Sequence, residues 1–292
     1  MSRPLTLILA AFGGGAPNHG AEDGPAVVEH SQYWPKLQHA FDKIHHLHTK
    51  KLPAHLAPVR ATHLVAQFDT LLRDTVHNTL HEGNLPLILG GDHTIAMGTW
   101  SGVVETLGDE ALGLIWIDAH MDAHTRHTSL SQAVHGMPVA VLLGQGESDL
   151  LGLSHHKPMV APTHFILMGA RSYEPGEAQL LNDLGVKVYF DAEIKSRGFE
   201  TCFQEALHAL EKTCARVGVS LDLDAIDPTE IPGVGSRTPN GLHAEEVKKA
   251  LHGFLCHPKS VAMEIAEYNP HKDEKEKTLK FIVELIEGVT HP

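Results

Sequence analysis

The stretch Gly113-Leu-Ile-Trp-Ile-Asp-Ala-His-Met-Asp-Ala-His124 determines how we interpret this chain. Its first half, from Gly113 to Ile117, is an apolar run typical of a strand buried on both faces. Its second half alternates acid, imidazole and acid at Asp118, His120 and Asp122. Side chains two residues apart on an extended backbone point to the same side, so these three groups converge where the strand ends. Charged groups there are costly unless they are paired or bind a cation, which favours a functional site over a polar turn.

Two further strand ends carry side chains of the same kind. The apolar run at residues 85–89 leads into Gly90-Gly-Asp-His93, which places His93 just beyond a strand. The segment Ser220-Leu-Asp-Leu-Asp-Ala-Ile-Asp-Pro228 places Asp222 and Asp224 on one face by the same two-residue period. In open parallel sheets, ligands bind outside the carboxyl ends of the strands. A single site can therefore collect all three groups.

Strands alternate with helices along the whole chain. Apolar runs predict strands at residues 5–10, 85–89, 112–117, 163–168, 186–190, 217–223 and 261–265. Helices are predicted at residues 63–81, 177–184, 200–216, 244–255 and 273–286, with one more that starts at Thr94. This alternation indicates parallel βαβ crossovers and a sheet covered on both faces. With no linker and no internal repeat, we expect one three-layer α/β/α domain over residues 1–292 with a mostly parallel central sheet.

Composition narrows the classes of function. The 292-residue chain has a formal net charge of -13, which argues against a nucleic-acid partner because phosphate binding needs a basic surface. Its three cysteines are scattered and odd in number, as in a reduced cytoplasmic protein. The apolar run near Met1 is too short to span a membrane. The glycine-rich segment at residues 13–20 does not follow the dinucleotide pattern G-x-G-x-x-G and is interpreted as a loop.

The set of donor groups predicts two metal ions. Four carboxylates and two imidazoles exceed what one catalytic zinc needs, since that ion takes three protein ligands and a water. Oxygen and nitrogen donors without thiolate favour a harder ion such as Mn²⁺. Two metals about 3.5–4 Å apart can hold a bridging hydroxide at neutral pH. Each motif alone has another interpretation, because D-x-D also occurs in Mg²⁺–phosphate sites and capped turns, and G-G-D-H in helix-entry turns.

In combination the motifs resemble those of the ureohydrolases, the family of arginases, agmatinases and formimidoylglutamases, and among them most the arginases. The resemblance runs from Leu5 to the last predicted helix. It rests on GGDHTIAMG (90–98), WIDAHMDAHT (116–125), SLDLDAIDP (220–228) and MEIAEYNP (263–270). It implies an arginase-like fold and a manganese-dependent hydrolase that cleaves a guanidino group to urea and an amine. The leading hypothesis is conversion of L-arginine to L-ornithine and urea.

The resemblance also implies which residues act. One Mn²⁺ would be held by His93 and Asp122 and the other by His120 and Asp224, with Asp118 and Asp222 bridging the two ions.

The implied reaction is attack of the metal-bridging hydroxide on the guanidinium carbon, and Asp122 is counted with the catalytic residues. Glu267 would pair with the guanidinium, because a planar cation is best oriented by a carboxylate. His135, in Val134-His-Gly-Met-Pro138, would supply the proton that the leaving amine needs, since imidazole titrates near neutral pH.

The loop predicted to hold the substrate tail departs from the family pattern. Ser129 and Ser131 stand where hydroxyl contacts are expected. His124 replaces the asparagine that arginases usually have, and Ala133 replaces a second one. Arg126 and His127 in the same loop either attract a substrate carboxylate or are solvated loop charges.

Two other substrate segments depart as well. Glu174 stands in an acidic segment that usually ends Asp-Pro-Gly-Glu, and it is expected to meet an α-ammonium group. Ser236 lies near the segment that closes over the substrate, Gly233-Val-Gly-Ser-Arg-Thr-Pro239, which departs from the usual Gly-Thr-Pro. These departures leave the choice of guanidino substrate open.

Other functions stay open at this point. The nearest alternative is an agmatinase or another guanidino- or formimino-acid ureohydrolase. A zinc deacetylase on a related fold needs only one metal, so Asp122 and Asp224 argue against it. A catalytically silent binding subunit would not need the ligands together with His135 and Glu267. The resemblance further implies a homo-oligomer, a trimer or hexamer, with a small guanidino molecule as its only other partner.

Overall fold

The computed structural model describes residues 3–49 and 58–291. In these residues one sheet of eight parallel strands has the order β2-β1-β3-β8-β7-β4-β5-β6. The strands are β1 (Leu5–Ala11), β2 (Lys43–His48), β3 (Leu85–Gly90), β4 (Leu112–Ile117), β5 (Phe165–Met168), β6 (Lys187–Tyr189), β7 (Arg216–Asp222) and β8 (Ser260–Ala266). The predicted three-layer α/β/α fold is confirmed, and the sheet is parallel throughout.

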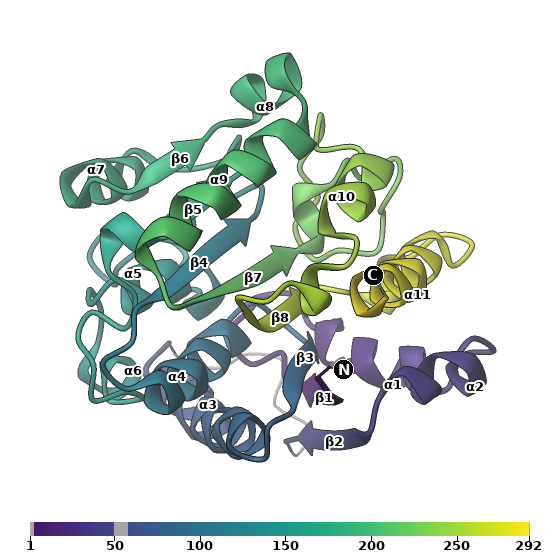
Figure 1. Ribbon diagram of the computed structural model, residues 1–292. Coiled ribbons are helices and arrows are strands. Elements are labelled where there is room, and N and C mark those ends of the chain that lie inside the picture. The colour runs from purple at the N-terminus through teal and green to yellow at the C-terminus, as the bar shows by residue number, and fades with distance from the viewer. Residues whose placement is uncertain (1–2, 50–57, 292) are drawn as a thin grey trace.

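Helices cover both faces of the sheet, as Figure 1 shows. One face packs against α1 (Gly24–Glu29), α2 (Trp34–Leu37), α8 (Asp191–Arg197), α9 (Phe199–Thr213), α10 (Ala244–Leu251) and α11 (Lys277–Thr290). The other packs against α3 (Pro58–His81), α4 (Ile95–Leu107), α5 (Pro138–Leu142), α6 (Ser148–Leu151) and α7 (Pro175–Leu184). Within β1, Leu7 and Leu9 face the first layer while Ile8 faces the second, as the two-residue period of a strand requires.

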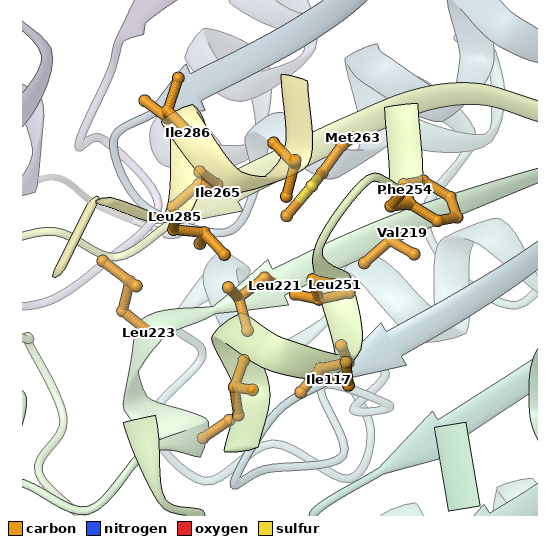
Figure 2. Packing of buried hydrophobic residues seen from close by; sticks show 14 of the residues in the cluster. Ile117, Val219, Leu221, Leu223, Leu251, Phe254, Met263, Ile265, Leu285 and Ile286 are labelled. Carbon is orange, nitrogen blue, oxygen red and sulfur yellow. The ribbon is translucent and has the colours of Figure 1, made fainter. Parts of the chain in front are cut away.

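The middle of the sheet is its most apolar part. Figure 2 shows Val219 and Leu221 of β7 beside Met263 and Ile265 of β8. Leu251, Phe254, Leu285 and Ile286 close over them from α10, the turn after it and α11. Full burial stabilises each such side chain by about 1.5–3 kcal/mol. This packing gives the strand ends above it a rigid base.

The structure corrects several of the predicted boundaries and adds a strand. The helix predicted at residues 273–286 is α11 (Lys277–Thr290), and the helix predicted from residue 63 begins at Pro58. The helix predicted to run to residue 216 ends at Thr213, because Cys214 is extended and leads into β7. The helix predicted to run to residue 255 ends at Leu251, and Gly253 then adopts a left-handed conformation. The strand predicted from residue 163 begins at Phe165, after a short 3₁₀ turn. Strand β2 was not predicted, because its sequence KIHHLH has a single fully buried residue, Leu47, at the edge of the sheet.

The four strands that precede the chemistry-bearing residues lie next to one another. β3, β8, β7 and β4 are consecutive across the sheet, although they come from both halves of the chain. Their carboxyl ends therefore meet at one edge, where open α/β sheets bind their ligands. None of the helices in the described residues is long and apolar enough to cross a membrane.

Candidate metal centre

His93 enters the site through a turn that requires glycine. A Cβ atom on Gly91 would lie 1.6 Å from the carbonyl oxygen of Phe12, so no other residue fits between β3 and β1 there. Asp92 accepts hydrogen bonds from the backbone N–H groups of Gly15 (2.7 Å) and Ala16 (2.9 Å). The glycine-rich segment is a loop, as predicted. Its hydrogen bonds to Asp92, which were not predicted, help to fix the backbone beside His93.

One ring nitrogen of His93, Nδ1, points toward three carboxylates and has no hydrogen-bond partner. Its Nδ1 atom lies 3.1 Å from Asp222 Oδ2 and 3.4 Å from both Asp118 Oδ2 and Asp122 Oδ2. These contacts do not form hydrogen bonds, and Nδ1 is fully buried. A buried polar atom without a partner is costly, and a cation between the ring and the three carboxylates would satisfy it.

The other nitrogen of the His93 ring sets the tautomer. Ser220 Oγ donates to Glu264 Oε1 at 2.8 Å, which leaves the hydroxyl oxygen free to accept from His93 Nε2 at 2.9 Å. Trp116 stacks on the same imidazole at 4.0 Å between ring centroids. Trp116, Ser220 and Glu264 form one row across β4, β7 and β8. With its proton on Nε2, His93 presents the lone pair of Nδ1 to the carboxylates, as a metal ligand must.

A second group of donors surrounds His120. Its Nδ1 atom lies 3.1 Å from Asp224 Oδ2 and 3.5 Å from Asp118 Oδ1. Asp118 thus turns one oxygen to each histidine, and the donor groups His93–Asp118–Asp222 and Asp118–His120–Asp224 share this residue. Two cation sites joined by a shared carboxylate match the donor chemistry of a two-metal centre.

The electrostatics at this edge of the sheet also favour the binding of cations. Burial, with Asp224 and Asp118 as close neighbours, raises the pKa of Asp222 well above its usual range. Burial and the charge of Asp118 raise the pKa of Asp122 to about 6. Four carboxylates gathered out of water repel one another, and metal ions relieve that repulsion.

Two residues at the site hold a backbone conformation that is rare outside glycine. Asp122 has a φ of 47° and Glu267 a φ of 68°. Asp122 is fixed by a hydrogen bond from Val139 N to its carbonyl oxygen at 2.9 Å, and Glu267 by a bond from its own N–H to Gly91 O at 2.8 Å. Such strain costs about 1–3 kcal/mol and is typical of functional positions.

His135 and Glu267 form a partly buried pair beside the carboxylates. His135 Nδ1 lies 3.1 Å from Glu267 Oε1, and the same oxygen accepts from the backbone N–H of His93 at 3.0 Å. Burial acts to lower the pKa of His135, but the hydrogen bond and charge of Glu267 outweigh it and raise the pKa to about 9. The imidazole is therefore a proton donor at neutral pH.

A cavity of about 140 Å³ opens onto these groups. Four predicted ligands (His120, Asp122, Asp222 and Asp224) line it together with His135. The positions predicted for the substrate tail line it as well, namely His124, Ser131, Ala133, Glu174 and Ser236. The cavity therefore joins the metal-ligand groups to the segments that depart from the ureohydrolase pattern.

Comparison with known proteins agrees with this geometry. The model of a family described as the arginase family matches residues 3–291. An arginase from Bacillus caldovelox is 32% identical over 293 residues, which covers 97% of this chain and 97% of that protein. The chain belongs to the arginase family. As an arginase-family hydrolase, it carries its candidate metal-binding residues at the ends of β3, β4 and β7.

Solved arginase structures share the fold over nearly the full length. The native structure of the B. caldovelox arginase has a TM-score of 0.90 at 31% identity, with 99% of each chain covered. The Entamoeba histolytica arginase, solved in complex with L-ornithine, has a TM-score of 0.90 at 27% identity and the same coverage. The layers and strand order described above are therefore those of arginases.

This arginase-family chain does not bring every predicted substrate residue to the cavity. Ser129 is buried outside the lining, and its hydroxyl accepts from Gln132 N at 2.9 Å. Arg126 does not extend to the cavity either, because its guanidinium donates to Glu147 Oε2 and Thr62 Oγ1, both at 2.8 Å. It is therefore a structural cation and not a solvated one.

Two further residues, Arg237 and Glu267, lie outside the lining of the cavity. Arg237 points away from the cavity and donates to the backbone oxygens of Pro232 (2.8 Å) and Lys272 (2.6 Å). Glu267 does not line the cavity itself but contacts His135, which does.

Four supporting residues were missed by the sequence reasoning. Asp92, Ser220 and Glu264 support His93, directly or through its backbone, as described above. Glu177 accepts from the backbone N–H of Ala123, the residue after Asp122, at 3.1 Å. A sequence signal existed for Ser220, which lies two residues before Asp222 and so shares its face of the strand. Glu264 lies inside an apolar run, and only the three-dimensional row of side chains reveals its partner.

Proposed function

We propose that this protein is a binuclear manganese hydrolase that converts L-arginine to L-ornithine and urea. The observation that carries the proposal is the pair of histidine–carboxylate groups that share Asp118. Family membership supports the reaction class, and the donor chemistry supports the metal, because oxygen and imidazole donors without thiolate suit Mn²⁺. We assign His93, Asp122, His120 and Asp224 to individual ions, with Asp118 and Asp222 between them.

The residues of the chain would have the following roles in the reaction. Two bound metal ions supply a nucleophile at neutral pH by lowering the pKa of water. Glu267, beside His135, orients the guanidinium so that its carbon faces the metal-ligand groups. The oxygen of this water would form a bond to the guanidinium carbon, and the bond between that carbon and the nitrogen of the substrate tail then breaks. His135 gives its proton to this nitrogen, which leaves as the amine of ornithine, while the carbon and its two remaining nitrogens leave as urea.

The assay that tests the proposal measures urea from L-arginine, agmatine and 4-guanidinobutyrate, each with Mn²⁺ added. We expect arginine to have the highest kcat/KM. Urea formed only from agmatine would replace arginase by agmatinase, and urea from none of the three would end the ureohydrolase proposal. One zinc per chain with no activation by Mn²⁺ would point to the deacetylase chemistry considered above, which needs only one of the two donor groups.

The pKa of His135 predicts the alkaline limit of activity. A donor with a pKa of about 9 is protonated through neutral pH and loses its proton above that value, so kcat should fall as pH rises through 9. His135→Asn should lower kcat by about 10²–10⁴-fold and remove this limb of the profile. His127→Asn, in an exposed position of the loop at residues 123–134, serves as the matched control. An unchanged alkaline limb in His135→Asn would assign the proton to another group.

Other expectations stay predictions. A homo-oligomer of three or six chains, a cytoplasmic location and a single domain over residues 1–292 follow from the resemblance and the composition.

A further inference from the structure

The two donor groups of the metal centre differ in how firmly their histidines are packed. We call them the His93 group (His93, Asp118 and Asp222) and the His120 group (Asp118, His120 and Asp224). The His93 side chain is fully buried and stacks on the ring of a tryptophan, whereas the His120 side chain is 27% exposed. Packing therefore fixes the His93 ring, and the His120 ring needs support from outside its own group.

A hydroxyl group faces the second nitrogen of the His120 ring. Thr238 Oγ1 lies 3.4 Å from His120 Nε2. This contact parallels that between Ser220 Oγ and His93 Nε2, since both rings turn Nδ1 to carboxylates and Nε2 to a hydroxyl oxygen. A hydroxyl that accepts from Nε2 leaves the lone pair of Nδ1 for a cation. Thr238 supplies this contact only while its own backbone is held beside the His120 ring.

Arg171, between β5 and α7, holds that backbone with its guanidinium. It donates to Thr238 O at 2.8 Å and to Pro239 O at 3.3 Å. The same guanidinium donates to Asp224 O at 2.8 Å and to Ala225 O at 2.9 Å, in the turn after β7. A guanidinium has five N–H donors in one rigid plane, so one side chain can join two segments in this way.

The backbone of Arg171 holds a third segment, the loop after β4. The N–H groups of Arg171 and Ser172 donate to Ala119 O at 2.9 and 3.0 Å. Ala119 stands directly before His120, and its N–H donates to Asp224 Oδ1 at 3.4 Å. Arg171 thus contacts both segments that supply the His120 group and the segment that carries Thr238.

The position of the guanidinium is tightly enclosed. A Cβ atom on Gly241 would lie 2.7 Å from one of its nitrogens, so the group has no room to shift on that side. In the described part of the chain, no hydrogen bond of the Arg171 side chain goes to His93 or Asp222. A lysine would keep the positive charge, but its single nitrogen cannot span the same carbonyl groups. Arg171 therefore supports one donor group and not the other.

We propose that Arg171 is a positioning residue that assembles the His120 group by joining the Asp224 turn to the backbone of Thr238, whose hydroxyl orients His120. The inference rests on the proposed two-metal site and names a residue on which half of that site depends. Arg171 is not a ligand itself and acts through the backbone of the ligand segments. Its loss lets the His120 ring and the Asp224 carboxylate move independently, which weakens one ion and spares the other.

Calorimetric titration of the metal-free protein with Mn²⁺ tests this without turnover. Arg171→Lys should weaken one of the two ions about 10–100-fold and leave the other unchanged. Thr238→Val removes only the hydroxyl and should weaken the same ion about tenfold, while Thr238→Ser should restore the wild-type affinity. Arg237→Lys is the matched control, because Arg237 also donates to backbone carbonyl groups in this segment, and it should change neither ion.

A double mutant identifies which ion is affected. His120→Asn should weaken one ion, and Arg171→Lys should add nothing to that loss if both act on the same site. Additive losses in the double mutant would place Arg171 elsewhere and overturn the inference. Circular dichroism checks that each variant folds, and Thr238→Val keeps the test decisive if Arg171→Lys does not fold, because an unchanged affinity in that variant contradicts the proposed link.

The remaining outcomes separate this inference from the proposed reaction. Equal weakening of both ions in Arg171→Lys, or the same loss in Arg237→Lys, would mean that the site is only loosened in general and would overturn the role of Arg171. A wild type that binds a single ion would overturn it together with the two-metal proposal. If two ions bind and the variants show the expected pattern but no guanidine yields urea, the reaction is wrong and the role of Arg171 stands.

Discussion

Asp222→Asn is expected to lower kcat/KM by at least about 1000-fold, or about 4 kcal/mol of transition-state stabilisation. Asp222 lies closest of the carboxylates to His93 Nδ1, and its loss removes one of the two carboxylates proposed to lie between the ions. Metal analysis should show fewer than two manganese ions per chain. Two ions and a wild-type rate in the variant would rule out this role.

Asp222→Asn lowers activity, but in the metal-free protein it should not lower stability. Burial and its acidic neighbours raise the pKa of Asp222, so its ionised form opposes folding when no cation is bound. Asparagine removes that charge, and the metal-free variant should melt no lower than the metal-free wild type. The manganese-loaded variant should melt below the loaded wild type. Asp109→Asn, at an exposed turn, should change neither temperature.

Removal of metal is expected to lower the melting temperature of the wild type by about 16 °C. Each ion present at about 1000 times its Kd stabilises a folded chain by about 4 kcal/mol, so two ions contribute about 8 kcal/mol, and each kcal/mol is worth about 2 °C in a chain of this size. Scanning calorimetry before and after chelation measures the difference, and added Mn²⁺ should restore the original value. Equal melting temperatures would mean that the carboxylates do not bind the ion.

The difference in melting temperature between the metal-loaded and the metal-free protein should depend on pH. The raised pKa of Asp122, about 6, means that the group takes up a proton below this value and competes with the metal. As pH falls through 6, the metal-free chain becomes more stable relative to its loaded form, because protonation relieves the repulsion among the carboxylates. The gap between the two melting temperatures should therefore narrow at acid pH.

Sequence alone predicted most of the sheet because most of its strands are apolar. Runs such as that of β4 need burial on both faces, and this need leaves a pattern in the sequence. Strand β2 lies at an edge and is mostly exposed, so its histidines carry no such pattern. The helix ends at Thr213 and Leu251 depend on where the next element begins, which local composition does not record.

The site could be predicted where its functional side chains follow a strand within a few residues. His93, Asp118 and Asp224 could be grouped because the carboxyl ends of parallel strands share an edge. The order of β3, β8, β7 and β4 was not predictable, and it alone explains why Glu264 stands beside Ser220. Ser129 was expected in the cavity because of its loop, but the loop turns its hydroxyl toward Gln132.

The arrangement of these four strands has a consequence for how the protein is made. β3 and β4 emerge from the ribosome early, yet β7 and β8 must later insert between them. Until residue 266 has been synthesised, the nascent chain exposes two apolar edges, and two of the six proposed metal donors, Asp222 and Asp224, come only with β7 and the turn after it. Catalytic competence and completion of the sheet thus arrive together, at the end of synthesis.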